Sequence, residues 1–216
     1  MTFLFMMAVG FVEYVPVLWL ALTLFRCDVR VYGKKTLIIA FFGAVVFYIV
    51  RFQYGLQSLG GPVATLVNTV LWFRFLFGFP LRNALLMTVS GFVLAVCAET
   101  LVNLLLIEAA NLSFAELTAS YGWMALSVTL ESALTLLIVG VLRRMRWGFS
   151  FLSARRPIRL RQNVHVLAFI VCGVLVSSLF LELLRSRVFD PFMVFIVFTL
   201  VVLFGFYSSM HKERED

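Results

Sequence analysis

Charged side chains, histidines and cysteines are all scarce in this chain. Only 13% of its 216 residues are charged, and it contains two histidines and three cysteines. Cys27, Cys97 and Cys172 are scattered, without a CxxC or a Cys/His ligand spacing. This spacing argues against a disulfide framework and a zinc site. We therefore expect no metal and no cofactor.

Catalytic motifs are missing as well. The sequence has no Walker loop and no HExxH, and the stretch 88–91 lacks the Gly-x-Ser-Gly of rhomboid-type serine proteases. His165 and Cys172 are seven residues apart, which places them about 10 Å apart along a helix, too far for a thiolate–imidazole pair. We expect a protein that is not an enzyme.

Long apolar runs dominate the sequence instead. Hydrophobic residues make up 62% of the chain, so lipid must be its solvent. The pattern predicts an all-α, polytopic transmembrane helical bundle with about seven spans, at residues 3–25, 36–50, 62–79, 84–107, 121–142, 164–184 and 191–209. We expect one transmembrane domain over residues 1–210 and a short charged cytoplasmic tail at 211–216. The second run is short, and to cross it borrows Val31 and Tyr32 at one end or Phe52 and Tyr54 at the other.

The basic residues are distributed unevenly between the connections. Fifteen of the eighteen lysines and arginines fall in the first, third and fifth connections and in the tail. Since basic loops remain in the cytoplasm, this predicts an N-terminus outside and a C-terminus inside, in a multi-pass protein of the bacterial inner cell membrane. The net charge of +7 then fits anionic lipid at the cytoplasmic face rather than nucleic acid.

Four carboxylates interrupt the apolar runs. Two are expected near mid-depth, one in the outer half and one near the outer end of its span. An ionisable group in hydrocarbon is costly and normally faces protein or water, so we interpret these carboxylates as a polar cavity for a cation or a basic part of a ligand. The alternative is that they pair with polar neighbours and lock helices together. The candidate cavity comprises Glu13, Glu99, Glu131, Glu182, Asn68 and Asn103.

The largest hydrophilic segment lies between residues 143 and 161. It holds seven arginines around an aromatic centre at 147–151. Guanidinium groups bind carboxylates and phosphates in a bidentate geometry, so we expect this segment to dock a partner or anionic headgroups. Its arginines are Arg143, Arg144, Arg146, Arg155, Arg156, Arg159 and Arg161.

Local signals mark two helix starts. Ser113 and Glu116 form a capping-box pattern, which predicts a short helix from Phe114 onward at the outer surface. Asp190 followed by Pro191 predicts the start of the last span.

The order of the runs resembles a known family. The chain has seven expected spans, short loops and a last span that continues into His211–Asp216. This organisation is similar to the membrane sensor region of quorum-sensing histidine kinases of the accessory-gene-regulator (GHKL) type. The stretch Leu71–Gly91, a helix, a break at Pro80 and a glycine-containing helix, also resembles such regions. The resemblance implies a sensor of an extracytoplasmic signal without the kinase domain. Such a sensor would act through a cytoplasmic or membrane protein partner, or as a homodimer.

Two other functions share these features. A substrate-binding membrane subunit of a vitamin or metal transporter would also be a compact helical protein with a basic cytoplasmic face. A cell-envelope scaffold would have the same architecture and no ligand. Fold alone does not decide between them. A co-purifying ligand would favour transport, and a signalling partner would favour sensing.

Overall fold

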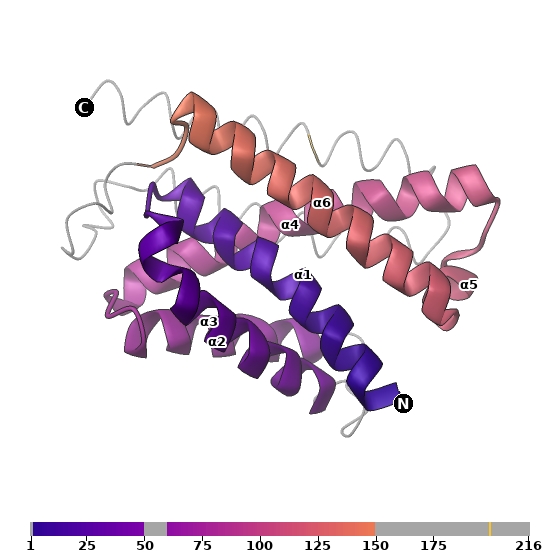
Figure 1. Ribbon diagram of the computed structural model, residues 1–216, viewed down its shortest axis with the longest axis horizontal. Helices are drawn as coiled ribbons and strands as arrows, with labels where there is room; N and C mark the ends of the chain where they lie inside the picture. The colour runs from indigo at the N-terminus through magenta and orange to yellow at the C-terminus, as the bar shows by residue number, and fades with distance from the viewer. Residues whose placement is uncertain (1, 50–59, 150–198, 200–216) are drawn as a thin grey trace.

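The described part of the chain is entirely helical. The computed structural model describes residues 2–49, 60–149 and 199, and within these ranges it contains six helices and no strand (Figure 1). The helices are α1 (Thr2–Leu24), α2 (Val29–Tyr48), α3 (Gly60–Phe75), α4 (Leu81–Ala110), α5 (Phe114–Ala119) and α6 (Tyr121–Met145).

Four of these helices are long and apolar enough to cross a membrane: α1, α2, α4 and α6. They correspond to the first, second, fourth and fifth predicted spans. Helix α2 starts at Val29, ahead of the predicted run, because Asp28 caps it by accepting a hydrogen bond from the backbone N–H of Arg30 at 2.9 Å. The second span thereby gains the length that its apolar run lacks.

The third predicted span is shorter than the sequence suggests. Helix α3 has 16 residues and is therefore about 24 Å long, whereas crossing the hydrocarbon takes about twenty residues. It ends at Phe75, because Gly78 with φ 74° and Pro80 break the chain before α4. The expected spans at 164–184 and 191–209, with the start at Asp190, lie outside the described residues. The described residues thus support four spans, and the count of seven stays a prediction.

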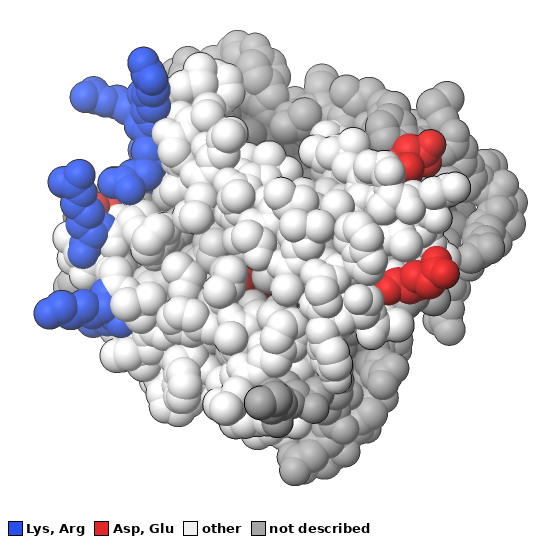
Figure 2. Space-filling view, turned by 45° about the vertical axis from the view of Figure 1, so that its right-hand side comes forward, with Lys and Arg blue, Asp and Glu red and all other residues white. Residues whose placement is uncertain are grey.

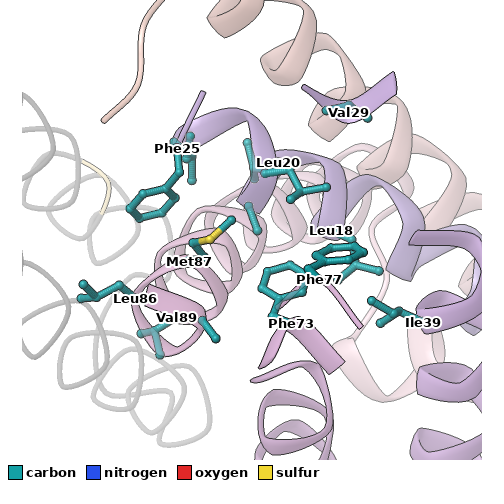
Figure 3. Close-up of a cluster of buried hydrophobic side chains, with 14 of the residues drawn as sticks. Leu18, Leu20, Phe25, Val29, Ile39, Phe73, Phe77, Leu86, Met87 and Val89 are labelled. Carbon is teal, nitrogen blue, oxygen red and sulfur yellow. The ribbon is translucent and has the colours of Figure 1, made fainter. Parts of the chain in front are cut away.

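Five helices form a closed ring of neighbours. Helix α1 packs against α2, α2 against α3, α3 against α4, α4 against α6, and α6 against α1, while α1 and α4 also touch each other (Figure 1). Large buried side chains fill the end of the ring where α1 ends and α4 begins, among them Leu18, Phe25, Phe73 and Met87 (Figure 3). The backbone of α1 therefore packs against three of the other four helices, and α1 occupies a central position in the bundle.

The outer surface is apolar between two charged ends. Exposed side chains such as Phe41, Phe42 and Leu137 suit contact with acyl chains. Figure 2 shows lysines and arginines along one edge of the molecule and acidic side chains mainly at the opposite edge, separated by a belt without surface charge except for a small acidic spot. The described basic residues lie in the α1–α2 turn and the first turns of α2, in the helix ends on either side of the α3–α4 connection, and at the end of α6. The alternating directions of the helices place all of these segments at one end of the bundle. We call this the basic end of the bundle.

Helix α5 begins with the predicted capping box. The Ser113 hydroxyl accepts a hydrogen bond from the backbone N–H of Glu116 at 3.2 Å, and the Glu116 carboxylate accepts one from the backbone N–H of Ser113 at 2.7 Å. These two bonds confirm the predicted helix start at Phe114. Hydrogen bonds from Ser113 also lower the pKa of Glu116.

Helices α1 and α4 approach each other closely at a glycine. A Cβ atom added to Gly91 would lie 2.6 Å from the Cβ of Ala21 and 3.0 Å from its Cα. Small residues of this kind let helix backbones meet in a membrane. Gly91 thus sets the distance between the two helices that carry Glu13 and Glu99.

The substitution Gly91→Ala should destabilise the bundle. The added methyl group must push α1 away from α4, and overpacking of this kind costs about 1–3 kcal/mol. The measurement is thermal unfolding of the detergent-solubilised protein, followed by circular dichroism. Gly140→Ala is the matched control, because a Cβ at Gly140 meets nothing within 4 Å and alanine favours the helix. Equal unfolding midpoints for the two variants would contradict the close approach.

Candidate functional site

Glu131 is the most deeply buried carboxylate of the described residues. Its side chain is 4% exposed, in the middle of α6 and on the part of the bundle where α6 packs against both α1 and α4. A carboxylate in this position must be neutralised or solvated by polar neighbours, because an isolated charge is costly in an apolar environment.

Two hydrogen bonds fix α6 on either side of Glu131. The Ser132 hydroxyl donates to the backbone carbonyl of Val12 on α1 at 3.2 Å. The Ser127 hydroxyl donates to the Asn103 side-chain oxygen on α4 at 2.5 Å. Because Val12 precedes Glu13, and Asn103 lies one turn beyond Glu99, these bonds bring the acidic positions of the three helices to similar levels.

Three carboxylates lie within electrostatic range of one another at this level. Glu13 and Glu99 both lie close enough to Glu131 to interact with it electrostatically. Glu13 is half-buried and Glu99 is exposed, so the group extends from the interior of the bundle to its surface. Figure 2 shows a small acidic area set into the middle of the apolar belt. We call Glu13, Glu99 and Glu131 the carboxylate centre.

The carboxylate centre attracts positive charge. Like charges repel strongly where the effective dielectric constant is low, so a proton or a bound cation stabilises the group. Within residues 2–49 and 60–149, no three His, Cys, Asp or Glu side chains are grouped as a metal site requires. A centre with one buried and one exposed carboxylate suits an ammonium or guanidinium group that enters from the surface.

A threonine beside the centre escaped the sequence analysis. Thr135 lies one turn after Glu131 on the same face of α6 and is 1% exposed, and its hydroxyl has no hydrogen-bond partner within residues 2–49 and 60–149. A buried hydroxyl without a partner is unusual and can serve a ligand or a water molecule. The signal in the sequence was weak, because Ser and Thr are common in membrane helices and form bonds within their own helix.

Asn68 does not belong to the carboxylate centre. It lies on α3, which has no contact with α6 among the described residues, and its side-chain oxygen accepts a hydrogen bond from the Trp72 indole at 3.0 Å. It neighbours a second polar contact, in which the buried Tyr14 hydroxyl donates to the Thr65 carbonyl and bonds the Thr69 hydroxyl at 2.6 Å. Asn68 therefore belongs to the contact between α1 and α3. Glu182 lies outside the described residues.

The predicted docking arginines are described in part. Arg143, Arg144 and Arg146 lie exposed at the end of α6 and at the basic end of the bundle. The other four, Arg155, Arg156, Arg159 and Arg161, lie outside the described residues.

Comparison of the chain with protein families, with curated proteins and with solved structures finds no match.

Cys27 offers a chemical readout at the basic end. Burial raises the pKa of its thiol to about 11, so the thiol is protonated at neutral pH. Between pH 7.5 and 9.5, alkylation by iodoacetamide should accelerate about a hundred-fold, whereas a free thiol with a pKa of about 8.5 accelerates about ten-fold. Mass spectrometry of a Cys97→Ser, Cys172→Ser variant checks this rate. Saturation of the rate near pH 9 would show that the thiol is not buried.

Proposed function

We propose that this chain is a non-catalytic, receptor-like module of a bacterial inner membrane, which senses an extracytoplasmic signal and acts through a protein partner at its basic end. The observation that carries the proposal is the carboxylate centre. Buried ionisable groups in membrane helices mark functional sites more often than structural ones, because they are costly to retain. The signal is a cation or a basic part of a ligand.

The arrangement of the helices supports transmission from the centre to the basic end. Helix α1 continues from Glu13 to its end at Leu24, and α6 continues from Glu131 to Arg143 in its last turn. The two helices are joined again at the basic end, where the backbone N–H of Phe149 donates to the Leu24 carbonyl at 2.6 Å. A ligand that binds one arrangement of α1 and α6 more tightly than another shifts the equilibrium between them, and a partner docked at the basic end reads that shift.

The proposed topology has seven spans, with the N-terminus outside and the C-terminus in the cytoplasm. It is supported by the fifteen-to-three distribution of basic residues and by the collection of described lysines and arginines at one end (Figure 2). In this orientation the centre is reached from the outer half of the bundle. The resemblance to the sensor region of accessory-gene-regulator-type kinases implies the same direction of signalling.

A substrate-binding subunit of a small-solute transporter is the second candidate. The position of Glu13 and Glu131 in the middle of their helices favours it, because transporters bind their substrates near the midplane of the bilayer. In that case the partner at the basic end supplies energy for uptake. The two functions differ in whether the ligand accumulates in the cell.

The topology predicts a labelling pattern. Single cysteines are introduced by Ser113→Cys or Ser153→Cys in a background that lacks the native cysteines. An impermeant thiol reagent on intact cells should label the first variant, because its cysteine lies outside, and spare the second. Permeabilised cells provide the control, in which both cysteines react. Labelling at position 153 but not at 113 would reverse the proposed orientation.

The carboxylate centre predicts binding of organic cations. Phenethylammonium or tetraphenylphosphonium should raise the unfolding midpoint of the detergent-solubilised protein, since a ligand at one hundred times its Kd stabilises the folded state by about 2.7 kcal/mol. Glu131→Gln should abolish the shift. Glu108→Gln is the matched control, because Glu108 is exposed near the end of α4.

Two outcomes discriminate between the candidates. An equal shift in the wild-type protein and in the Glu131→Gln variant would contradict a ligand role for the centre. Accumulation of the radiolabelled cation in cells, dependent on Glu131, would favour the transporter subunit over the receptor.

A further inference from the structure

A cavity of about 400 Å³ opens at the basic end, between the α1–α2 turn and the last turn of α6. Its volume lies in the range of small-molecule sites. Four of its lining residues are arginines, two from each side of the cavity. The residues that bear on its chemistry are Arg26, Arg30, Arg143, Arg146, Asp28 and Trp147.

The backbone holds the two sides of the cavity together. The hydrogen bond from the Phe149 N–H to the Leu24 carbonyl joins the segment after α6 to the end of α1. Gly148 permits this contact, because its φ is 146° and a Cβ atom there would lie 2.6 Å from the Leu24 oxygen. The cavity is thus part of a fixed junction between two helix ends.

Two of the arginines occupy an unusual backbone conformation. Arg26 and Arg146 both have φ 52°, in the left-handed region that helix ends usually fill with glycine. A side chain at such a position strains the backbone by about 1 kcal/mol, and strained residues cluster at functional sites. The same residue type in the same conformation on both sides of one cavity indicates that the guanidinium groups are needed there.

The electrostatics of the cavity favour an anion. Asp28 is the single acidic residue among the described side chains that line the cavity, and it already accepts a hydrogen bond from the backbone N–H of Arg30 as the cap of α2. The positive end of the α2 dipole lies at the same place and adds to the field of the four guanidinium groups.

We propose that this cavity binds a phosphate ester, the anionic headgroup of a phospholipid being the form found at this depth. Several guanidinium groups around one site match the oxygens of phosphate in bidentate geometry. The exposed Trp147 at the cavity is a residue type that anchors proteins at headgroup level. The site lies at the basic end, whereas the carboxylate centre lies in the middle of the bundle, and it does not depend on the proposed function.

The test compares neighbouring arginines on the full chain. Arg143 lines the cavity and Arg144 does not, although both are exposed in the last turn of α6. Binding of phosphatidylglycerol in detergent micelles is measured by native mass spectrometry for Arg143→Gln and Arg144→Gln. The first change should weaken binding about ten-fold, the effect of losing one charge-assisted hydrogen bond, and the second less than about two-fold. Both variants lose the same charge, so general attraction cannot produce the difference.

A second variant separates binding from folding. Arg26→Gly together with Arg146→Gly removes two guanidinium groups and relieves two left-handed backbones, so the unfolding midpoint should stay equal or rise while binding is lost.

Each outcome of the comparison has a defined meaning. Binding of phosphatidylglycerol but not of inorganic phosphate, with the difference between Arg143 and Arg144, supports the lipid headgroup as the source. If phosphatidylglycerol and inorganic phosphate both bind, and Arg143→Gln weakens binding more than Arg144→Gln does, the site is supported and soluble phosphate esters are ligands as well. Three results would overturn the proposal. The two glutamine variants could lose phosphatidylglycerol affinity equally, or the double glycine variant could bind it as tightly as the wild-type protein does. The third is that oleate, which has no phosphate, binds as tightly as phosphatidylglycerol.

Discussion

The constraint on which this bundle depends is the cost of keeping Glu131 in an apolar environment. The side chain is buried in α6, and the chain surrounds it with the two helices that carry Glu13 and Glu99. The serine contacts on either side of Glu131 fix α6 against α1 and α4, so the buried carboxylate lies near those of the half-buried Glu13 and the exposed Glu99. Binding of a proton or a cationic ligand then changes the relative stability of different arrangements of these helices, as a receptor requires.

Close helix packing makes this arrangement possible. Gly91 allows α1 and α4 to touch at Ala21, and Gly43 of α2 lies where any side chain would collide with the ring of Tyr14. Because α1 is packed tightly on both sides, a shift of α1 caused by ligand binding at Glu13 can occur mainly along the helix axis or at the basic end. That end contains the junction between Leu24 and Phe149 and the arginine-lined cavity, so both proposed sites lie on the same two helices.

The sequence predicted the features that depend on local signals. The helical class and the start of α5 at its capping box follow from residue pattern and capping chemistry. The sequence left open at which end the short second span is extended, and the cap at Asp28 places the extension at its start. It did not predict which residues meet across helices. These helices are apolar on most sides, so periodicity gives little information about their inner faces. Asn68 was grouped with the acidic residues although it belongs to the contact of α3, and the left-handed Arg26 and Arg146 carry no sequence signal because glycine is the residue expected there.

The most direct measurement is a double-mutant cycle on the carboxylate centre. Thermal unfolding of Glu13→Gln, Glu131→Gln and the double variant is compared with that of the wild-type protein in detergent. Residues in contact or in one network couple by at least about 0.5 kcal/mol, and distant ones add within about 0.3–0.5 kcal/mol. The account predicts clear coupling, since replacing one carboxyl group changes the electrostatic environment of the other. Additive effects of the two substitutions would contradict a shared centre.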